Sequence, residues 1–167
     1  MKSRRALVVL VALVLIVIDR LTKVWAAANL QIGVPKQIVG DFFRFNLTYN
    51  PGAAFSLLTN ATWIFALFAA CASVFILWYA PRIGRTSFAI AAGGVLAGAS
   101  GNLIDRCINE PGFPSGHVTD FLELPYWPIF NIADSSITIS MTFIIIMLLL
   151  GYNPDGTREN KKASAHE

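Results

Sequence analysis

The chain has 167 residues, of which 55% are hydrophobic and only 14% are charged, and its mean hydropathy is +0.58. Soluble domains carry about 25% charged residues, so this composition excludes an ordinary soluble domain and indicates an integral membrane protein. A span needs about 20 apolar residues, so the length allows a few spans with short connections, and the net charge of +3 is informative mainly through its distribution.

Four apolar stretches follow one another along the chain. They cover residues 6–18, 62–80, 88–104 and 137–151, and the spans predicted from them are 6–27, 61–80, 86–106 and 131–151. This predicts an all-α membrane protein with four transmembrane helices. Residues 1–152 are expected to form one domain, and the polar residues 153–167 are expected to form a disordered cytoplasmic tail.

Basic residues indicate how the spans are oriented. They precede the first span, separate the second from the third and follow the fourth: Lys2, Arg4, Arg5, Arg82, Arg85, Arg158, Lys161 and Lys162. With four spans, all three clusters fall on one side, which the positive-inside rule makes cytoplasmic. Both termini are then inside, and residues 27–60 and 107–130 face outward.

The first apolar stretch also has features of a cleavable signal peptide, with a basic start and an Ala-rich segment at 26–28. The charged segment DRLTK (19–23) separates the two features, which disfavours cleavage. Thirteen apolar residues cover only about 20 Å of a hydrocarbon core about 30 Å thick, so the helix is expected to continue through Asp19 and Lys23. This i,i+4 pair either faces the protein interior or anchors the helix end at the interface.

Polar residues of the spans and outer segments gather at the outer face. They are Asp19, Lys23, Asn50, Asn102, Asp105, Arg106, Asp120, Asn131 and Asp134. A channel or transporter subunit, the rival hypothesis, needs such groups throughout the membrane depth. Clustering at one face favours a site that works at the interface.

The third apolar stretch carries small residues at helical spacing. Gly94 and Gly98 form a GxxxG motif, which lets neighbouring helices approach closely. In the segment GASG (98–101), Ser100 resembles the serine of rhomboid proteases, but no predicted helix supplies the histidine base. Ser100 is therefore expected to be a packing residue.

Metal and thiol chemistry are disfavoured by the residues present. The two histidines, His117 and His166, are predicted on opposite sides of the membrane, and no HExxH motif occurs. Cys71 and Cys107 have no CxxC spacing, and we expect them to be small buried hydrophobic residues.

Carboxylates remain as candidate catalytic groups. Asp120 ends the second outer segment and Asp134 begins the fourth helix, so these two are best placed to meet. Two adjacent carboxyl groups share a proton, and such a pair can activate water while polarising a peptide carbonyl. Asn131 and Asp134 also have the spacing of a helix N-cap, and the capping and catalytic interpretations are compatible.

Five motifs together resemble one family. DRLTK (19–23), NPGAAF (50–55), GNLIDR (101–106), VTDF (118–121) and FNIAD (130–134) occur in the order found in bacterial lipoprotein signal peptidase, or signal peptidase II, and the resemblance covers about residues 5–150. It implies an inner-membrane aspartic protease that cuts diacylglyceryl-modified prolipoproteins before the lipidated cysteine. It also implies a small extracytoplasmic sheet in segment 30–58, between the first two helices, and inhibition by globomycin-type compounds.

The resemblance also assigns roles to individual residues. Asp120 and Asp134 correspond to the catalytic dyad, and a further set corresponds to positions that shape the site: Asp19, Lys23, Asn50, Gly52, Asn102, Arg106 and Asn131. No cofactor or metal is implied, and the expected partners are prolipoproteins and membrane lipid but no nucleic acid, with the enzyme a monomer. The outer loop at 107–117 is longer than the usual connection of the family, so the resemblance assigns it no role.

Overall fold

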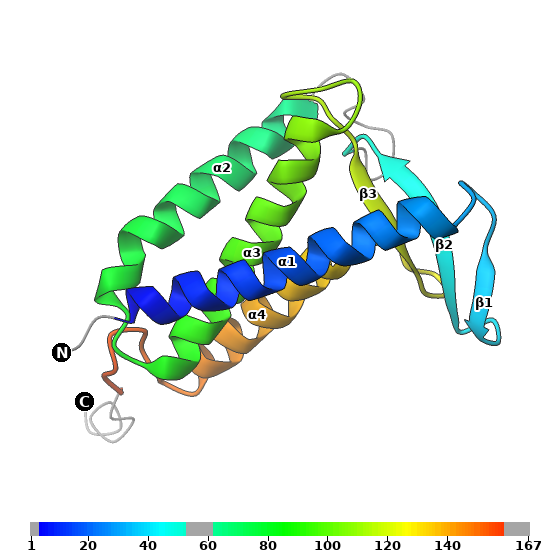
Figure 1. Cartoon of the computed structure of the whole chain (residues 1–167). Helices are drawn as coiled ribbons and strands as arrows, with labels where there is room; N and C mark the ends of the chain where they lie inside the picture. The colour runs from blue at the N-terminus through cyan, green and yellow to red at the C-terminus, as the bar shows by residue number, and fades with distance from the viewer. Residues whose placement is uncertain (1–3, 53–61, 159–167) are drawn as a thin grey trace.

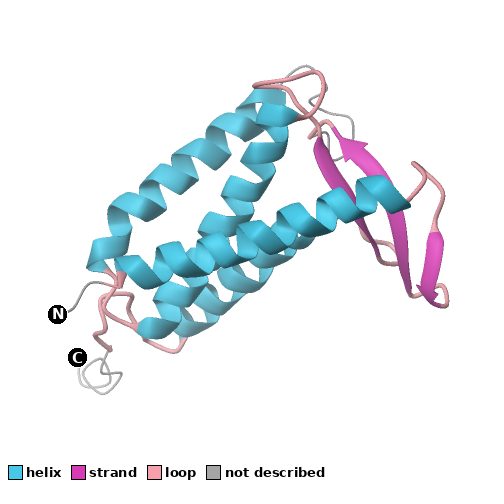
Figure 2. Ribbon diagram, in the orientation of Figure 1, coloured by secondary structure: helices cyan, strands magenta, loops and turns pink. Residues whose placement is uncertain are grey.

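The computed structural model describes residues 4–52 and 62–158, which form four long helices, a short 3-10 helix and three strands. In chain order these are α1 (Arg5–Asn29), β1 (Lys36–Val39), β2 (Phe43–Asn50), α2 (Thr62–Tyr79), η2 (Ala80–Arg82), α3 (Thr86–Ile108), β3 (Val118–Glu123) and α4 (Ile132–Leu149). The helices form one bundle, with the strands at the end where α1 finishes (Figures 1 and 2). The prediction of a mostly helical chain with a small sheet is therefore confirmed. Residues 53–58 of the outer segment 30–58, residue 61 and residues 159–167 lie outside the described part.

Three of the described helices are long and apolar enough to cross a membrane: Thr62–Arg82, Thr86–Ile108 and Ile132–Leu149. Helix α1 is also long, with 25 residues, but it carries three charged residues close together near its end. Asp19 and Lys23 are turned inward while apolar side chains face out: Lys23 is 2% exposed, whereas Leu21 is 65% exposed. Such a reversed pattern suits a helix whose surroundings are lipid.

Helix α3 forms the centre of the bundle and packs against α1, α2 and α4. Its glycines make this possible, because an added Cβ at Gly93 would lie 2.8 Å from Val11 Cβ of α1, and one at Gly94 or Gly98 would collide with α4. The predicted small-residue ridge is confirmed, with faces toward both neighbours. Close approach of the backbones brings the polar end of α3 between α1 and α4.

The sheet has the strand order β1-β2-β3, and both pairs are antiparallel. Its third strand comes from the segment between α3 and α4, so the prediction of a sheet confined to the segment between the first two helices is incomplete. The pairing sets Asp120 opposite Thr48 and Val118 opposite Asn50. Strand β3 is therefore held between β2 and the helices, and it carries one of the two candidate carboxylates.

The end of the bundle opposite the sheet has an apolar core. It includes Val8 and Ala12 of α1 and Phe88, Leu96 and Ala97 of α3. The first residues of the expected disordered tail, 153–158, form an ordered turn here, in which the Pro154 carbonyl accepts from the backbone N–H of Gly84 at 2.9 Å.

Both cysteines are exposed on the protein surface, so the prediction that they are buried is wrong. The physical reason is the solvent: a helix in lipid places small apolar side chains outward as readily as inward, so hydrophobicity does not report burial there.

Candidate active site

Five elements converge on a cavity of about 480 Å³ at the sheet end of the bundle, and four of them supply its polar groups. Strand β3 contributes Asp120, α4 contributes Asp134, α3 contributes Asn102 and Arg106, and the end of β2 contributes Asn50. The remaining lining is mostly apolar and comes largely from α2 and α3, for example Phe65, Phe68, Ala72, Val95 and Ala99. The cavity thus joins two carboxylates to an apolar wall.

Asp120 is buried, with 1% of its surface exposed. Its carboxylate accepts hydrogen bonds from Asn50 Nδ2 at 2.9 Å and from Asn131 Nδ2 at 2.6 Å. Burial, followed by the negative charge of Asp134, raises the pKa of Asp120 to about 7, against the lowering effect of the two amides. This carboxyl group is therefore partly protonated at neutral pH.

Asp134 is fixed by the start of α4. Asn131 is the N-cap, its Oδ1 accepts from the backbone N–H of Asp134 at 2.9 Å, and Asp134 Oδ2 accepts from the backbone N–H of Asn131 at 3.1 Å. The predicted cap is confirmed as a reciprocal capping box. Because the same Asn131 side chain reaches Asp120, one residue holds both carboxylates in place.

Three asparagines direct their NH₂ groups at the carboxylates, and in each case a donor on the other side fixes the amide orientation. The Asn50 oxygen accepts from Gly52 N at 2.7 Å, the Asn131 oxygen from Asp134 N, and the Asn102 oxygen from Lys23 Nζ at 3.1 Å. An ammonium or backbone N–H can only donate, so each amide must present its oxygen there and its NH₂ elsewhere. For Asn102, that NH₂ donates to Asp134 Oδ1 at 2.7 Å.

Behind the asparagines lies a cluster of two cations and two carboxylates, of which only Arg20 is partly exposed. Lys23 Nζ is 2.8 Å from Asp19 Oδ2 and 2.9 Å from Asp105 Oδ2, and Arg20 pairs with the other oxygen of Asp105. Asp19 Oδ1 accepts from the backbone N–H of Ala133 in α4 at 2.9 Å. Asp105 Oδ2 accepts from the backbone N–H of Thr119 in β3 at 3.0 Å. The cluster therefore positions both chain segments that carry the candidate dyad.

Gly52 and Arg106 form another part of the cavity wall. Gly52 has φ +95, and a Cβ there would lie 2.8 Å from Phe65 Cδ2 and 2.9 Å from an Arg106 side-chain nitrogen, so only glycine fits without displacement. Arg106 donates to the Gly116 carbonyl at 3.1 Å, and its guanidinium carbon is 5.5 Å from the centre of the Phe65 ring. The long outer loop is thus tied to the site through Arg106.

Within residues 4–52 and 62–158, no group of three or more His, Cys, Asp or Glu side chains could hold a metal ion. The polar partners of the two carboxylates in this part of the chain are amides and backbone N–H groups.

Comparison with known proteins decides the family. The family model described as Signal peptidase (SPase) II matches residues 11–150. The chain belongs to the signal peptidase II family. Signal peptidase II relatives include the lipoprotein signal peptidase of Rhodococcus jostii, 42% identical over 161 residues, which covers 94% of this chain and 79% of that protein. The lipoprotein signal peptidase of Mycobacterium avium is 39% identical over 160 residues, covering 96% of this chain and 88% of that protein.

Two solved structures share the fold of this signal peptidase II family member, and both are described as bacterial membrane enzymes studied by the in meso method. One, at 1.9 Å resolution, has a TM-score of 0.77 and 29% identity, and covers 89% of this chain and 96% of its own. The other, at 2.3 Å, has a TM-score of 0.78 and 28% identity, and covers 96% of this chain and 99% of its own. The bundle with its small sheet is therefore a fold already seen in membrane enzymes.

All nine predicted site residues of this signal peptidase II chain lie at the sheet end. Five of them bring polar side chains to the cavity, Gly52 forms its wall, and Asn131 bridges the carboxylates, whereas Asp19 and Lys23 lie in the cluster behind. The motifs contain Arg20 and Asp105, but neither residue was assigned a role from the sequence. Their pairing could have been expected, because a charged residue within a membrane segment needs a charged partner.

Proposed function

We propose that this chain is a membrane-embedded aspartic endopeptidase, with Asp120 and Asp134 as its catalytic dyad. Its substrate is a diacylglyceryl-modified prolipoprotein, and it cuts the peptide bond before the lipidated cysteine. Family membership supports the substrate class, since the similar proteins of Rhodococcus jostii and Mycobacterium avium are lipoprotein signal peptidases. No metal or cofactor takes part in the proposed reaction.

The observation that carries this proposal is the pair of carboxylates facing one cavity and bridged by Asn131. Each carboxylate has fixed partners, so the pair is preorganised for proton transfer. The charge of one raises the pKa of the other, as expected for a dyad that holds a single proton between two groups. The pKa of about 7 for Asp120 supports this residue as the holder of that proton.

In the proposed reaction the ionised Asp134 takes a proton from a water molecule, whose oxygen attacks the carbonyl carbon of the scissile bond. Protonated Asp120 gives its proton to the carbonyl oxygen, which produces a neutral gem-diol. The gem-diol then collapses as Asp134 gives the proton it received to the leaving nitrogen and Asp120 regains a proton from a gem-diol hydroxyl. Peptide and water become acid and amine, and the dyad returns to its starting state.

The proposed setting is the bacterial inner membrane. The proposed topology has four spans, both termini in the cytoplasm and the active site at the extracytoplasmic face. It agrees with the end of the bundle opposite the sheet, where α1 begins (Figure 1) and where basic residues lie: Arg4 before α1, Arg82 in η2, Arg85 before α3, and Arg158 beside Arg85 at Tyr152. A substrate anchored by acyl chains stays in the bilayer, and the apolar wall beside the carboxylates suits it. We propose that residues 1–152 act as one monomeric unit.

The test is cleavage of a synthetic precursor by the purified protein in micelles. Asp120→Asn and Asp134→Asn are each expected to reduce kcat by about 10²–10⁴-fold or more, because acid–base catalysis is lost. Asp41→Asn, which changes an exposed carboxylate outside the cavity, serves as the matched control. Normal cleavage by either dyad variant would refute the dyad. Equal cleavage of lipidated and unlipidated precursor would refute the substrate assignment.

A further inference from the structure

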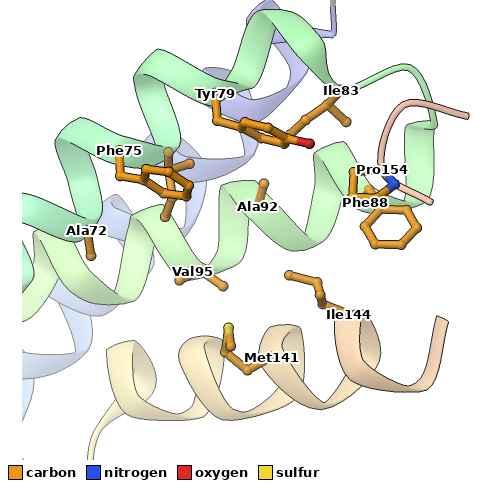
Figure 3. Close-up of a pocket in the computed structure, with 11 residues that line it drawn as sticks. Ala72, Phe75, Tyr79, Ile83, Phe88, Ala92, Val95, Met141, Ile144 and Pro154 are labelled. Carbon is orange, nitrogen blue, oxygen red and sulfur yellow. The ribbon is translucent and has the colours of Figure 1, made fainter. Parts of the chain in front are cut away.

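A second pocket adjoins the cavity of the carboxylates, with which it shares Ala72 and Val95, and extends between α2, α3 and α4 with a volume of about 320 Å³ (Figure 3). Phe75 and Tyr79 line it from α2, Phe88 and Ala92 from α3, and Met141 and Ile144 from α4. Apart from the hydroxyl of Tyr79, the lining side chains are apolar. In a membrane, such a space takes a hydrocarbon chain.

The dimensions of the pocket limit its occupant. A helix with its side chains is about 10–12 Å across, which is wide for a recess of about 320 Å³ between the side chains of three helices. The pocket therefore suits a slender occupant better than a helix of a substrate or of a second copy. An acyl chain, which is much thinner, is compatible with it.

The turn after η2 and the beginning of the tail border one end of the pocket. Ile83 and Pro154 lie at this end, and Figure 3 shows the Tyr79 hydroxyl pointing toward it. The Pro154 carbonyl accepts from the backbone N–H groups of Gly84 at 2.9 Å and Arg85 at 3.3 Å. This contact places the backbone of Arg85 next to Pro154 and so beside this end of the apolar pocket.

Positive charge is concentrated at the same place. The guanidinium carbons of Arg85 and Arg158 are each 4.5 Å from the centre of the Tyr152 ring, so two like charges share one aromatic side chain. Within the described residues neither arginine forms an ion pair with a carboxylate. Arg85 Nη2 donates a long hydrogen bond of 3.4 Å to the Gly156 carbonyl, and Arg85 Nε is buried without a hydrogen-bond partner among the described residues. Asp155, the acidic residue of this turn, is engaged by the backbone and hydroxyl of Thr157.

We propose that this end of the protein binds one anionic phospholipid. Its phosphate lies against Arg85 and Arg158, where it offsets the repulsion between them, and one acyl chain occupies the pocket. Basic pockets between transmembrane helices are known to recognise anionic head groups in this manner. The inference does not rest on the proposed catalytic function or on the membrane orientation.

The test is native mass spectrometry of the full chain with phosphatidylglycerol and phosphatidylethanolamine of identical acyl chains. Wild type is expected to retain one phosphatidylglycerol in preference. The double variant R85Q/R158Q is expected to lose about tenfold or more of that retention, since each basic residue contributes about fivefold. R4Q/K36Q removes the same charge at two exposed residues and is expected to behave as wild type. M141W fills the pocket and is expected to reduce retention of both lipids.

Each outcome bears on the proposal. Equal retention of the two lipids by wild type would show hydrocarbon binding alone and overturn the head-group site. If R85Q/R158Q kept the preference for phosphatidylglycerol, the phosphate would bind elsewhere. If M141W retained both lipids as wild type does, the acyl chain would not occupy this pocket. Circular dichroism of each variant separates these results from loss of the fold.

Discussion

The two ends of the helix bundle differ in what is buried there, because among the described residues only the sheet end contains a buried polar network. At the sheet end, polar or charged side chains are buried beside a small apolar cluster of Ala26, Leu47, Phe121 and Leu122. The buried polar set is Asp19, Lys23, Asp105, Asp120 and Asn131, each at most 2% exposed. At the other end, the buried core consists of apolar side chains. At the sheet end, α1 and α3 meet through ion pairs and α4 joins them through hydrogen bonds. At the other end, the helices meet through close apolar packing.

This difference has an energetic consequence. In a buried polar network each group supplies a hydrogen bond or an opposite charge to its neighbours. Removing one group therefore leaves buried charges or hydrogen-bonding groups without a partner. In an apolar interface a substitution costs only what the local packing loses. Changes at the sheet end are therefore expected to affect stability and chemistry together, whereas changes at the far end affect stability alone.

The largest expected effect comes from Lys23→Met. The ammonium group lies within 3.1 Å of Asp19, Asp105 and Asn102, so its loss leaves Asp19 without a cation and releases Asn102. Breaking a buried pair in this way costs about 3–5 kcal/mol. A strong fall in the thermal unfolding midpoint and loss of cleavage are expected. Lys36→Met, at an exposed position, is the control, and equal midpoints for the two variants would contradict the role of the cluster.

Two glycine substitutions compare the ends directly. An added Cβ would lie 2.8 Å from Val11 Cβ in Gly93→Ala and 2.8 Å from Asp19 Oδ2 in Gly101→Ala. Overpacking of this kind costs about 1–3 kcal/mol, so both variants are expected to lose stability. Only Gly101→Ala displaces Asp19, which holds the start of α4 through Ala133.

The measurement is kcat/KM per folded molecule beside the unfolding midpoint. Gly93→Ala is expected to keep a normal kcat/KM, and Gly101→Ala to lose activity in addition to stability. An equal loss of kcat/KM in both variants would mean that packing at the apolar end also controls the geometry of the active site.

Much of the fold could be predicted from local sequence patterns. The apolar stretches predict the helices, and the spacing of Gly94 and Gly98 predicts a close helix contact, because both signals are contained in one segment. The burial of Asp19 and Lys23 resolves the choice between interior and interface that spacing alone left open.

Long-range pairing could not be predicted in the same way. Strand β3 is buried at five of its six positions, so it lacks the alternation that marks a strand facing water, and its partner β2 lies far away in the chain. Arg20 and Asp105 are 85 positions apart, and no periodicity relates such residues. The candidate dyad was predictable by motif, but its Asn131 bridge and the cluster behind it required the structure.

A smaller effect is expected for Asn50→Ala, which tests the polar end through its pH dependence. The hydrogen bond from Asn50 favours the ionised form of Asp120 and lowers its pKa, which burial and Asp134 together raise to about 7. If Asp120 acts while protonated, kcat falls as the pH rises through this value in wild type. Without Asn50 the pKa of Asp120 rises further, so the alkaline limb of the kcat profile is expected to move to higher pH.

Tyr49→Phe changes an exposed ring next to Asn50 on the same strand, and it should leave the alkaline limb in place. If the alkaline limb of Asn50→Ala stayed at the wild-type pH, Asp120 would not be the group whose titration produces it.

The smallest expected effect is that of Ser100→Ala, which tests whether the polar end contains a second nucleophile. Ser100 lies on α3 within the GASG segment, but its hydroxyl is 3.3 Å from the hydroxyl of Ser73 on α2, which itself donates to the Ala69 carbonyl. A hydroxyl without a base is a weak nucleophile, and Ser100 is not among the residues that line the cavity. Its loss removes one neutral hydrogen bond, worth about 0.5–1.5 kcal/mol, so a small shift of the unfolding midpoint with unchanged kcat is expected. A loss of kcat comparable to that of the aspartate variants would instead assign the reaction to serine chemistry and leave the buried carboxylates as structural groups.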